Sequence, residues 1–453
     1  MSLVRDFGAV GDGVADDTEA IQHAVDRGDG VLELDRGTYR ITRTIEVDLT
    51  KTGYAGIQGA QGTVRIVMAG SGPAFRIAGD HQGTADPGSV EPHTYDGERF
   101  PVISGIEILG EHEKADGIQL YRTMQATVQS VLIRRCRYGI HLVERNRNFI
   151  LSNSHVYHCR DTGVFFDNCN LHQTILIGNH ISYSGRAGIR QYNGDVHNIQ
   201  ITGNDIEYNS GVEGSSGEIV LEAPEGTISE YTISSNTLQA TRPASGANIL
   251  IIGKQEDPPT CVRAIAISGN VIGSRNRSID VAYGQRIAIT GNTIYDGIDL
   301  NLRLAECTHS VVSGNTILTR PASFDSTSRD GVLLERCVCC ALVGNILNGG
   351  SLGSKESGGS ITLSDCRECS VSSCLIQNSA FRGIHLQDSR RCRISDNTIG
   401  GEASPPDYVA AIEVSGEGGE NVIQNNAVRE GSQGAILADE ARQAVLGNTV
   451  WTD

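Results

Sequence analysis

The chain has 453 residues and a formal net charge of −17 at pH 7. An acidic surface of this strength argues against nucleic acid as a partner. No apolar run approaches the ~18 residues of a membrane-spanning helix, so we expect no contact with a membrane. Fifty-four glycines, with only eight phenylalanines and one tryptophan, indicate a narrow core with many tight bends.

The first part of the chain, residues 1–45, predicts one helix followed by short strands. Apolar residues at positions 20, 21, 24 and 25 share one face of a helix, and Asp16 and Asp17 precede them as helix-start residues. Residues 31–34 and 37–41 alternate as strands do. Because the end of a stacked array needs cover, we interpret residues 1–45 as a cap.

Residues 79–100 form a long polar insertion without a pattern of its own. A connection of this length is usually functional or disordered. It contains His81 and His93, which are weak candidates for metal ligands. We expect the insertion to lie beside a binding groove, at a place that the sequence does not fix.

From residue 46 to the end of the chain, two short phrases recur. The form apolar-x-apolar-Ser/Thr/Gly-Gly/Ser-Asn occurs at residues 201–204 and 289–292, and the form Gly-Ile-x-Leu-x at residues 117–121 and 383–387. Copies are roughly 20–35 residues apart, which leaves room for two or three strands but for no helix. This spacing excludes βαβ units and predicts a parallel β-helix over residues 46–453 as one continuous domain.

The asparagine that ends each copy of the first phrase has a structural interpretation. We expect it at a tight bend, where asparagine tolerates a left-handed backbone and stacked side-chain amides bond to one another. Ten amides in a row have no catalytic chemistry in common, which favours this interpretation over a catalytic one.

Residues 4–41 closely resemble the opening of the pectate-lyase-like superfamily of right-handed parallel β-helices. The shared phrases are Asp-Phe-Gly-Ala-x-Gly-Asp-Gly at residues 6–13 and Asp-Asp-Thr-x-Ala-Ile-Gln at residues 16–22. Polygalacturonases, polysaccharide lyases, alginate epimerases and phage tailspikes share them. The resemblance implies an all-β, right-handed parallel β-helix with an N-terminal capping α-helix, and a carbohydrate polymer as ligand. The motifs typical of polygalacturonases and alginate epimerases are absent, which argues against both activities.

In each Gly-Ile-x-Leu-x phrase, both x positions face outward, on the sheet where members of the superfamily bind sugars. Superposing the phrases places Asp280 directly beside Asp299, with Asn301 next to them and Tyr283 just beyond. Two carboxylates this close need a shared proton or a bound cation. They predict either a glycosidase pair or a Ca²⁺ site with ligands from Asp280, Asp299 and Asn301.

A lyase that cleaves a uronate needs a base for the proton at C5, which a bound cation would acidify. The resemblance assigns this base to Arg303, which lies further along the coil of Asp299, or to Lys254. Arginine is a poor base at its usual pKa, so the assignment depends on the resemblance.

A second cluster is predicted from the same outward positions at Asp167, Arg190, Tyr192 and Glu222. An arginine between two acids forms either a surface ladder of ion pairs or a sugar subsite. As a subsite, Arg190 would hold a sugar carboxylate with two hydrogen bonds, and Tyr192 would stack on a pyranose ring.

The twelve cysteines are expected to be free thiols that pack as small hydrophobic groups. Cys340, Cys369 and Cys392 should stack as a column, as should Cys337 with Cys366. No second cysteine pair with companion histidines gives the spacing of a zinc finger. Many free thiols and the lack of a signal-type segment fit a reducing compartment, whereas the resemblance implies an extracellular or periplasmic one.

Three functions follow as hypotheses. The first is a polysaccharide lyase, with Ca²⁺ as a possible cofactor, that cleaves a uronate-containing glycan by β-elimination. The second is a glycoside hydrolase that uses Asp280 and Asp299. The third is a non-catalytic, tailspike-like glycan-binding module. The expected partner in each case is a polysaccharide, and the chain is expected to be a monomer or a homotrimer.

Overall fold

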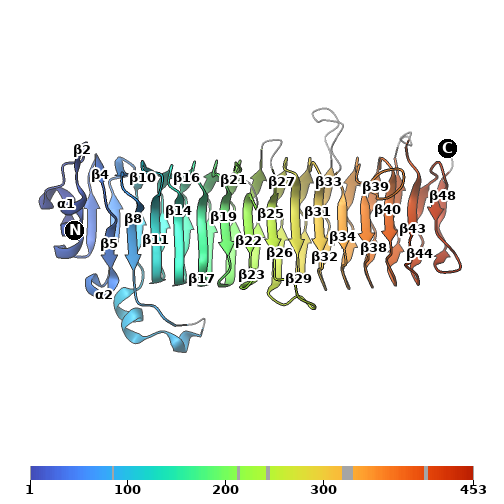
Figure 1. Cartoon of the computed structure of the whole chain (residues 1–453), viewed down its shortest axis with the longest axis horizontal. Coiled ribbons are helices and arrows are strands. Elements are labelled where there is room, and N and C mark those ends of the chain that lie inside the picture. The colour runs from blue at the N-terminus through green and yellow to red at the C-terminus, as the bar shows by residue number, and fades with distance from the viewer. Residues whose placement is uncertain are drawn as a thin grey trace. The chain divides into compact units, whose positions relative to one another are not determined.

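The computed structural model describes residues 2–83, 86–211, 215–240, 245–318, 330–401 and 407–451. Its contacts group the chain into two compact units, residues 1–232 and residues 233–453. In each unit, successive turns of chain add parallel strands to three sheets, as in a right-handed parallel β-helix (Figure 1). The predicted fold class is confirmed, whereas a single continuous domain over residues 46–453 stays a prediction.

The strands of unit 1 fall into three sheets. The first sheet contains β5 (Ile45–Asp48), β8 (Gly72–Ala78), β11 (Ala115–Met124), β14 (Tyr138–Arg147), the start of β17 (Thr162–Ile177), β19 (Ala187–Tyr192) and β22 (Gly217–Glu222). The second contains β1 (Ser2–Leu3), β3 (Val31–Leu34), β6 (Gly56–Gly59), β9 (Val102–Ser104), β12 (Thr127–Gln129), β15 (Ile150–Ser152), the end of β17, β20 (Asp195–Thr202) and β23 (Thr227–Ser234). The third contains β2 (Asp12–Asp16), β4 (Gly37–Ile41), β7 (Val64–Met68), β10 (Ile106–Gly110), β13 (Leu132–Arg134), β16 (His155–Tyr157), β18 (His180–Ser182) and β21 (Asp205–Glu207).

The strands of unit 2 repeat this arrangement. The first sheet contains β25 (Ala247–Ile252), β28 (Arg277–Ala282), β31 (Leu300–Ala305), β34 (Val332–Glu335), β37 (Ile361–Ser364), β40 (Arg382–Gln387), β43 (Ala410–Ser415) and β46 (Ile436–Leu437). The second contains β26 (Val262–Ser268), β29 (Gly284–Thr290), β32 (Val311–Ser313), β35 (Ala341–Val343), β38 (Ser370–Ser372), β41 (Arg393–Ser395), β44 (Val422–Gln424) and β47 (Ala444–Leu446). The third contains β24 (Thr237–Gln239), β27 (Val271–Gly273), β30 (Thr293–Tyr295), β33 (Thr316–Leu318), β36 (Ile346–Asn348), β39 (Leu375–Gln377), β42 (Thr398–Gly400), β45 (Ala427–Arg429) and β48 (Thr449–Trp451).

The predicted N-terminal helix is present as α1 (Thr18–Arg27). It buries Ile21 and Ala24. The Asp17 carboxylate, itself buried, accepts hydrogen bonds from the backbone N–H groups of Val10 (2.6 Å) and Gly11 (3.1 Å). Asp17 is therefore structural, as predicted, while the capping role of α1 stays a prediction.

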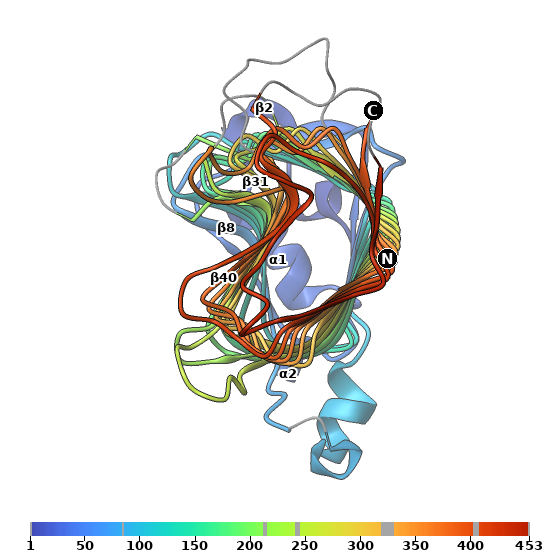
Figure 2. The ribbon, with the colours of Figure 1, turned by 90° about the vertical axis from the view of Figure 1, so that its right-hand side faces the viewer.

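The insertion at residues 79–100 contains two short helical turns, η2 (Pro87–Ser89) and η3 (Thr94–Glu98), and η3 packs against α2 (Leu49–Thr52). Figure 2 shows this segment projecting from the coils next to α2. Asp80 accepts a hydrogen bond from Thr94 Oγ1 (2.8 Å), and its backbone N–H donates to Glu98 Oε2 (2.8 Å). Apart from residues 84 and 85, which lie outside the described residues, the insertion thus has a structure of its own.

Alternation along the first-sheet strands decides which side chains face solvent. Ile118 and Leu120 of β11 pair with Ile140 and Leu142 of β14, and all four side chains are fully buried. The residues between them therefore point outward and face one another across strands that are ~4.8 Å apart. A register of this kind places chemistry from distant parts of the sequence side by side.

Stacked asparagines connect the second sheet to the third, as predicted. In unit 2, Asn292 Nδ2 donates to Asn315 Oδ1 (2.9 Å) and to the carbonyl of Ile267 (3.0 Å). One detail of the prediction was wrong, because the left-handed residue at this bend is usually the one before the asparagine, as at Gly291 (φ 65°). Glycine takes this conformation without a steric penalty, which leaves the asparagine free to bond.

All twelve cysteines are free thiols, and ten of them are buried. The predicted column is supported by the backbone N–H of Cys340, which lies 3.4 Å from Cys369 Sγ. Burial raises the pKa of Cys159 to about 12, so this thiol stays protonated. Among the described residues, no helix is long and apolar enough to cross a membrane.

Candidate functional site

Outward side chains of the first sheet in unit 1 form a polar surface that crosses neighbouring strands in two adjacent columns. We call this surface the polar strip and define it as Arg76, Gln119, His141 and Arg190 in one column and Asp167 and Glu222 in the other. Each member comes from a different one of the strands β8, β11, β14, β17, β19 and β22. The strip exists because the parallel register brings residues from neighbouring coils into contact.

The centre of the polar strip is a histidine that is held between an amide and a carboxylate. His141 Nε2 lies 3.0 Å from Asp167 Oδ2, and its Nδ1 lies 3.3 Å from Gln119 Nε2. Because a carboxylate only accepts, we assign the proton to Nε2, which leaves Nδ1 as the acceptor for the amide. His141 is only 6% exposed, whereas Asp167 is partly exposed. The histidine therefore fixes the position of a carboxylate that solvent and ligands can reach.

Arg190 is the main cation of the strip. Its Nη2 lies 3.3 Å from Glu222 Oε2, and its guanidinium carbon is 5.2 Å from the ring centroids of both Phe165 and Tyr192. Its Nε is buried and has no hydrogen-bond partner. The guanidinium thus keeps one buried donor unsatisfied and forms its ion pair through Nη2.

Aromatic rings lie between the charged groups of the strip. His141 stacks on Phe165 with an interplanar angle of 3°, and Tyr138 lies 5.0 Å from Phe165, centroid to centroid. Arg76 lies over the ring of Tyr121 at 4.6 Å. Burial raises the pKa of the Tyr138 hydroxyl, so it stays protonated.

The structure brings together the four residues of the second predicted cluster. Asp167 lies directly opposite Tyr192, and Tyr192 lies opposite Glu222. His141 was not among the predicted site residues, although it occupies the outward position of its own Gly-Ile-x-Leu phrase. A polar residue at that position in the coil next to Asp167 was the signal that could have identified it.

The predicted pair of Asp280 and Asp299 is wrong. The residue opposite Asp280 on the adjacent strand is Arg303, and Asp299 precedes β31 and is exposed. Asp280 is only 4% exposed and is held by Arg303 Nη1 at 3.1 Å and by Arg277. A carboxylate held by two guanidinium groups is a structural ion pair, so the glycosidase pair proposed from the sequence does not form.

The role of Arg303 as the base stays a prediction, and its surroundings count against it. Burial acts to lower the pKa of Arg303, but Asp280 and Glu335 raise it above its usual value, which keeps the guanidinium charged. Lys254 is exposed in the connection between β25 and β26, and Tyr283 lies at the bend after β28. Within the described part of the chain, no hydrogen bond or ion pair joins either residue to Asp280.

The predicted Ca²⁺ site is not formed by the three proposed ligands. Asn301 is buried, and its Oδ1 accepts a hydrogen bond from the backbone N–H of Gly297 at 2.9 Å. It serves the local turn, while Asp280 is held by arginines and Asp299 is exposed. The use of Ca²⁺ as a cofactor stays a prediction.

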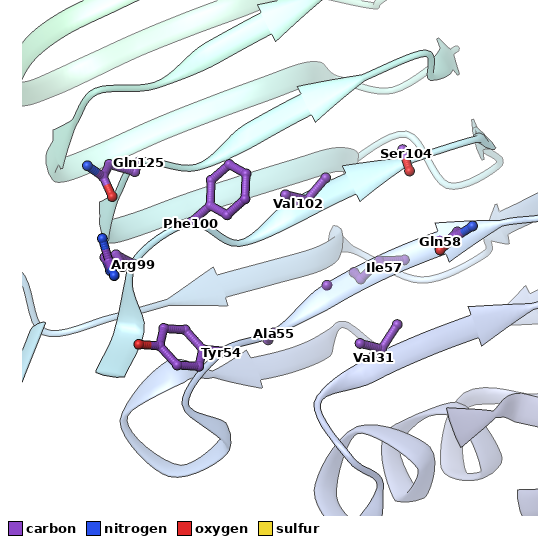
Figure 3. Close-up of a pocket in the computed structure, with 11 residues that line it drawn as sticks. Val31, Tyr54, Ala55, Ile57, Gln58, Arg99, Phe100, Val102, Ser104 and Gln125 are labelled. Atoms are coloured by element: carbon purple, nitrogen blue, oxygen red, sulfur yellow. The ribbon is translucent and has the colours of Figure 1, made fainter. Parts of the chain in front are cut away.

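A separate hollow of about 520 Å³ lies on the second sheet of unit 1. Figure 3 shows Tyr54, Phe100 and Arg99 at one end and Gln58 and Ser104 at the other. The two aromatic side chains are 59% and 61% exposed. The size and mixed lining suit a small ligand, but the hollow offers one charged group where the polar strip offers four.

Three sequence families match different parts of the chain. Residues 2–89 match the family described as rhamnogalacturonase A/epimerase, pectate lyase-like. Residues 96–253 match the family described as right handed beta helix region, and residues 229–413 match periplasmic copper-binding protein (NosD). No relative among curated proteins matches the chain.

Solved structures with a similar fold have little sequence identity with the chain. The Dettilon tailspike protein is 15% identical with a TM-score of 0.50, over 91% of this chain and 68% of that one. The bacteriophage CBA120 tailspike protein 3 is 13% identical with a TM-score of 0.46, over 100% of this chain and 60% of that one. The mannuronan C-5 epimerase A-module of Azotobacter vinelandii is 16% identical with a TM-score of 0.35, over 99% and 100%.

Proposed function

Since the chain belongs to the pectate-lyase-like superfamily of right-handed parallel β-helices, we propose that it acts on a polysaccharide bound along the polar strip. The observation that carries the proposal is the alternation of charged groups and aromatic rings on successive strands. An extended polymer can contact such a row over its whole length. A compact ligand would use only a small part of it.

The composition of the polar strip favours an acidic glycan. The guanidinium of Arg190 can bind a uronate carboxylate through two parallel hydrogen bonds. The ring of Tyr192, which is 39% exposed, offers an apolar face for the C–H groups of a pyranose. Because the whole chain carries a net charge of −17, an acidic polymer needs local cations such as Arg76 and Arg190 to overcome the repulsion.

The reaction we propose is β-elimination, in which the chain acts as a polysaccharide lyase. Arg190 neutralises the carboxylate of the uronate, which makes the proton at C5 more acidic. Asp167, held in place by His141, takes this proton. The electron pair forms the C4–C5 double bond, the C4–oxygen bond breaks, and Tyr192 donates a proton to the leaving oxygen.

Hydrolysis is the second candidate, and one observation favours it. Asp167 and Glu222 occupy the same outward column, with Tyr192 between them. Two strand spacings separate them by roughly 10 Å, close to the carboxyl separation of inverting glycosidases. The ion pair between Glu222 and Arg190 counts against this candidate, because the acid would have to leave its partner.

A panel of acidic and neutral glycans tests these candidates directly. The ultraviolet absorbance of an unsaturated uronate identifies a lyase, and new reducing ends without it identify a hydrolase. Binding without either product identifies a non-catalytic glycan-binding module. For the lyase we expect Asp167→Asn to lose at least ~100-fold in rate, the range of general acid–base catalysis.

Variants at two places show where the glycan binds. Arg190→Met should weaken binding to an acidic glycan, while Phe100→Ala in the separate hollow should leave it unchanged. If Phe100→Ala abolishes binding and Arg190→Met does not, the polar strip is not the site. Full turnover by Asp167→Asn would contradict the role of Asp167 as the base. It would not contradict the proposed binding site.

We propose an extracellular or periplasmic location, where polysaccharides of this kind occur. For the assembly we propose a monomer or a homotrimer, which the mass measured by light scattering distinguishes. Sensitivity of turnover to EDTA would show whether Ca²⁺ takes part.

A further inference from the structure

Two histidines and an aspartate meet where the first sheet of unit 1 turns into the second. His172 of β17 lies opposite His197 of β20, and Asn170 lies opposite Asp195. The two imidazole rings are parallel within 8°, with centroids 4.9 Å apart. Asp195 Oδ1 lies 2.7 Å from His197 Nε2.

The three side chains already lie close to the geometry of a metal site. One ligand atom from each of His172, Asp195 and His197 lies within 4.8 Å of the other two. Tetrahedral coordination at ~2.1 Å brings ligand atoms to about 3.4 Å from one another, so only small side-chain rotations are needed. Because β17 and β20 are hydrogen-bonded neighbours, their backbones hold these positions.

A second observation points to a missing ligand at the same place. His172 is 8% exposed, and its Nδ1 is buried without a hydrogen-bond partner. A buried imidazole nitrogen without a partner is unfavourable unless something binds it. Asp195 is exposed, so an ion can reach the cluster from solvent.

We propose that His172, Asp195 and His197 form a binding site for a divalent transition-metal ion such as Zn²⁺ or Ni²⁺. Two imidazole nitrogens and one carboxylate suit these metals, whereas Ca²⁺ and Mg²⁺ prefer oxygen ligands alone. Three protein ligands leave a coordination position open for water or a ligand.

The surroundings of the site affect its affinity and its access. Arg147 lies opposite His172 on β14, and a guanidinium nearby opposes the binding of a cation. We therefore expect affinity in the roughly micromolar range. A hollow of about 370 Å³ adjoins the site, lined by Gln173 and Asn198, the residues directly after the two histidines.

Titration calorimetry of the full chain with Zn²⁺ and with Ni²⁺ tests the proposal. We expect one ion per chain, with the affinity reduced at least tenfold in both His172→Ala and His197→Ala. Co²⁺ serves as a spectroscopic probe, because ligation by nitrogen and oxygen gives visible bands without the charge-transfer absorption of a thiolate.

The chain offers a matched control on β16 and β18 of the third sheet. His155 and His180 also lie opposite each other, with ring centroids 5.1 Å apart, but their rings meet edge-on. His155→Ala should therefore leave metal binding unchanged. His93→Ala tests the other possible cluster, formed by Asp80, His93 and Glu98.

Three results would overturn the proposal. The first is unchanged binding in both His172→Ala and His197→Ala, and the second is a loss that occurs only in His155→Ala or His93→Ala. The third is binding of sulfate, added as a probe, without binding of any metal, since Arg147 would then define an anion site. Melting curves that match the wild type show that the variants are folded. The test does not depend on a glycan, so it can fail while the proposed function holds.

Discussion

Arg303 lies directly opposite Asp280 on the adjacent strand, with its Nη1 3.1 Å from Asp280 Oδ1. The same guanidinium binds Glu335 through Nε, and Arg277 binds the other oxygen of Asp280. Positive and negative side chains thus alternate across three strands of the first sheet in unit 2. Opposite charges facing each other across a sheet stabilise it, whereas the two facing carboxylates predicted from the sequence would have destabilised it.

Asp280→Asn should destabilise unit 2 by about 3 kcal/mol, because Arg277 loses its buried counter-charge and Arg303 keeps only its ion pair with Glu335. Asp299→Asn should change the free energy of unfolding by less than about 0.5 kcal/mol, because Asp299 is exposed. Urea denaturation of both variants measures the difference. Equal effects would contradict the structural role of Asp280.

Asn292→Ala should destabilise the chain by about 2–3 kcal/mol. The side chain of Asn292 donates to Asn315 and accepts from Asn270, and its removal leaves buried backbone groups unpaired. Asn348 is the matched control, because it also accepts from another asparagine amide, that of Asn378 at 2.8 Å, but is exposed. For Asn348→Ala, thermal unfolding should show a loss of stability below about 1 kcal/mol. A similar loss at both positions would contradict the conclusion that the stacked asparagines stabilise the fold.

Acid should destabilise unit 2 through His385. Burial lowers the pKa of His385 to about 4, and Nδ1 accepts a hydrogen bond from the backbone N–H of Gly358 at 2.9 Å. The unfolded chain takes up this proton near pH 6.5, so stability is lost as the pH falls from about 6.5 to 4. The loss is at most about 3 kcal/mol.

His385→Gln isolates this contribution of one histidine from all other titrating groups. The melting temperature of the wild type should fall more steeply between pH 6.5 and pH 4 than that of the variant. Parallel curves over this range would show that His385 is not held in its neutral form.

Only Cys261 and Cys339 should react with a thiol reagent in the folded chain, because the other ten cysteines are buried. A buried thiol reacts slowly, since burial raises its pKa and keeps the thiolate scarce. Counting alkylated cysteines by mass spectrometry, before and after unfolding in guanidinium, provides the check. Rapid modification of the buried column at Cys340 and Cys369 would contradict this packing.

The repeated phrases were enough to predict the fold, because the apolar positions in each phrase indicate which side chains face inward. They were not enough for the register around Asp280. The segment from Gly297 to Asn301 imitates the Gly-Ile-x-Leu-x phrase, but the paired strand places Leu302 and Leu304 opposite Ile279 and Val281. A shift of four residues keeps the inward and outward faces of a strand, so alternation cannot detect it.

The polar strip could be predicted in part. Asp167, Arg190, Tyr192 and Glu222 were found because the Gly-Ile-x-Leu-x phrases around them are in register. The role of His141 depends on two hydrogen bonds to neighbouring coils, and these exist only once three strands are aligned. No pattern within one coil contains that information.

The decisive measurement for a glycan site on the polar strip is the affinity of an acidic oligosaccharide for the wild type and for Arg190→Met. The substitution removes the guanidinium while keeping an unbranched side chain over Phe165, so we expect at least a tenfold increase in the dissociation constant, or about 1.4 kcal/mol. A neutral oligosaccharide should bind both proteins equally weakly. An unchanged dissociation constant for the acidic ligand would contradict a glycan site on the polar strip.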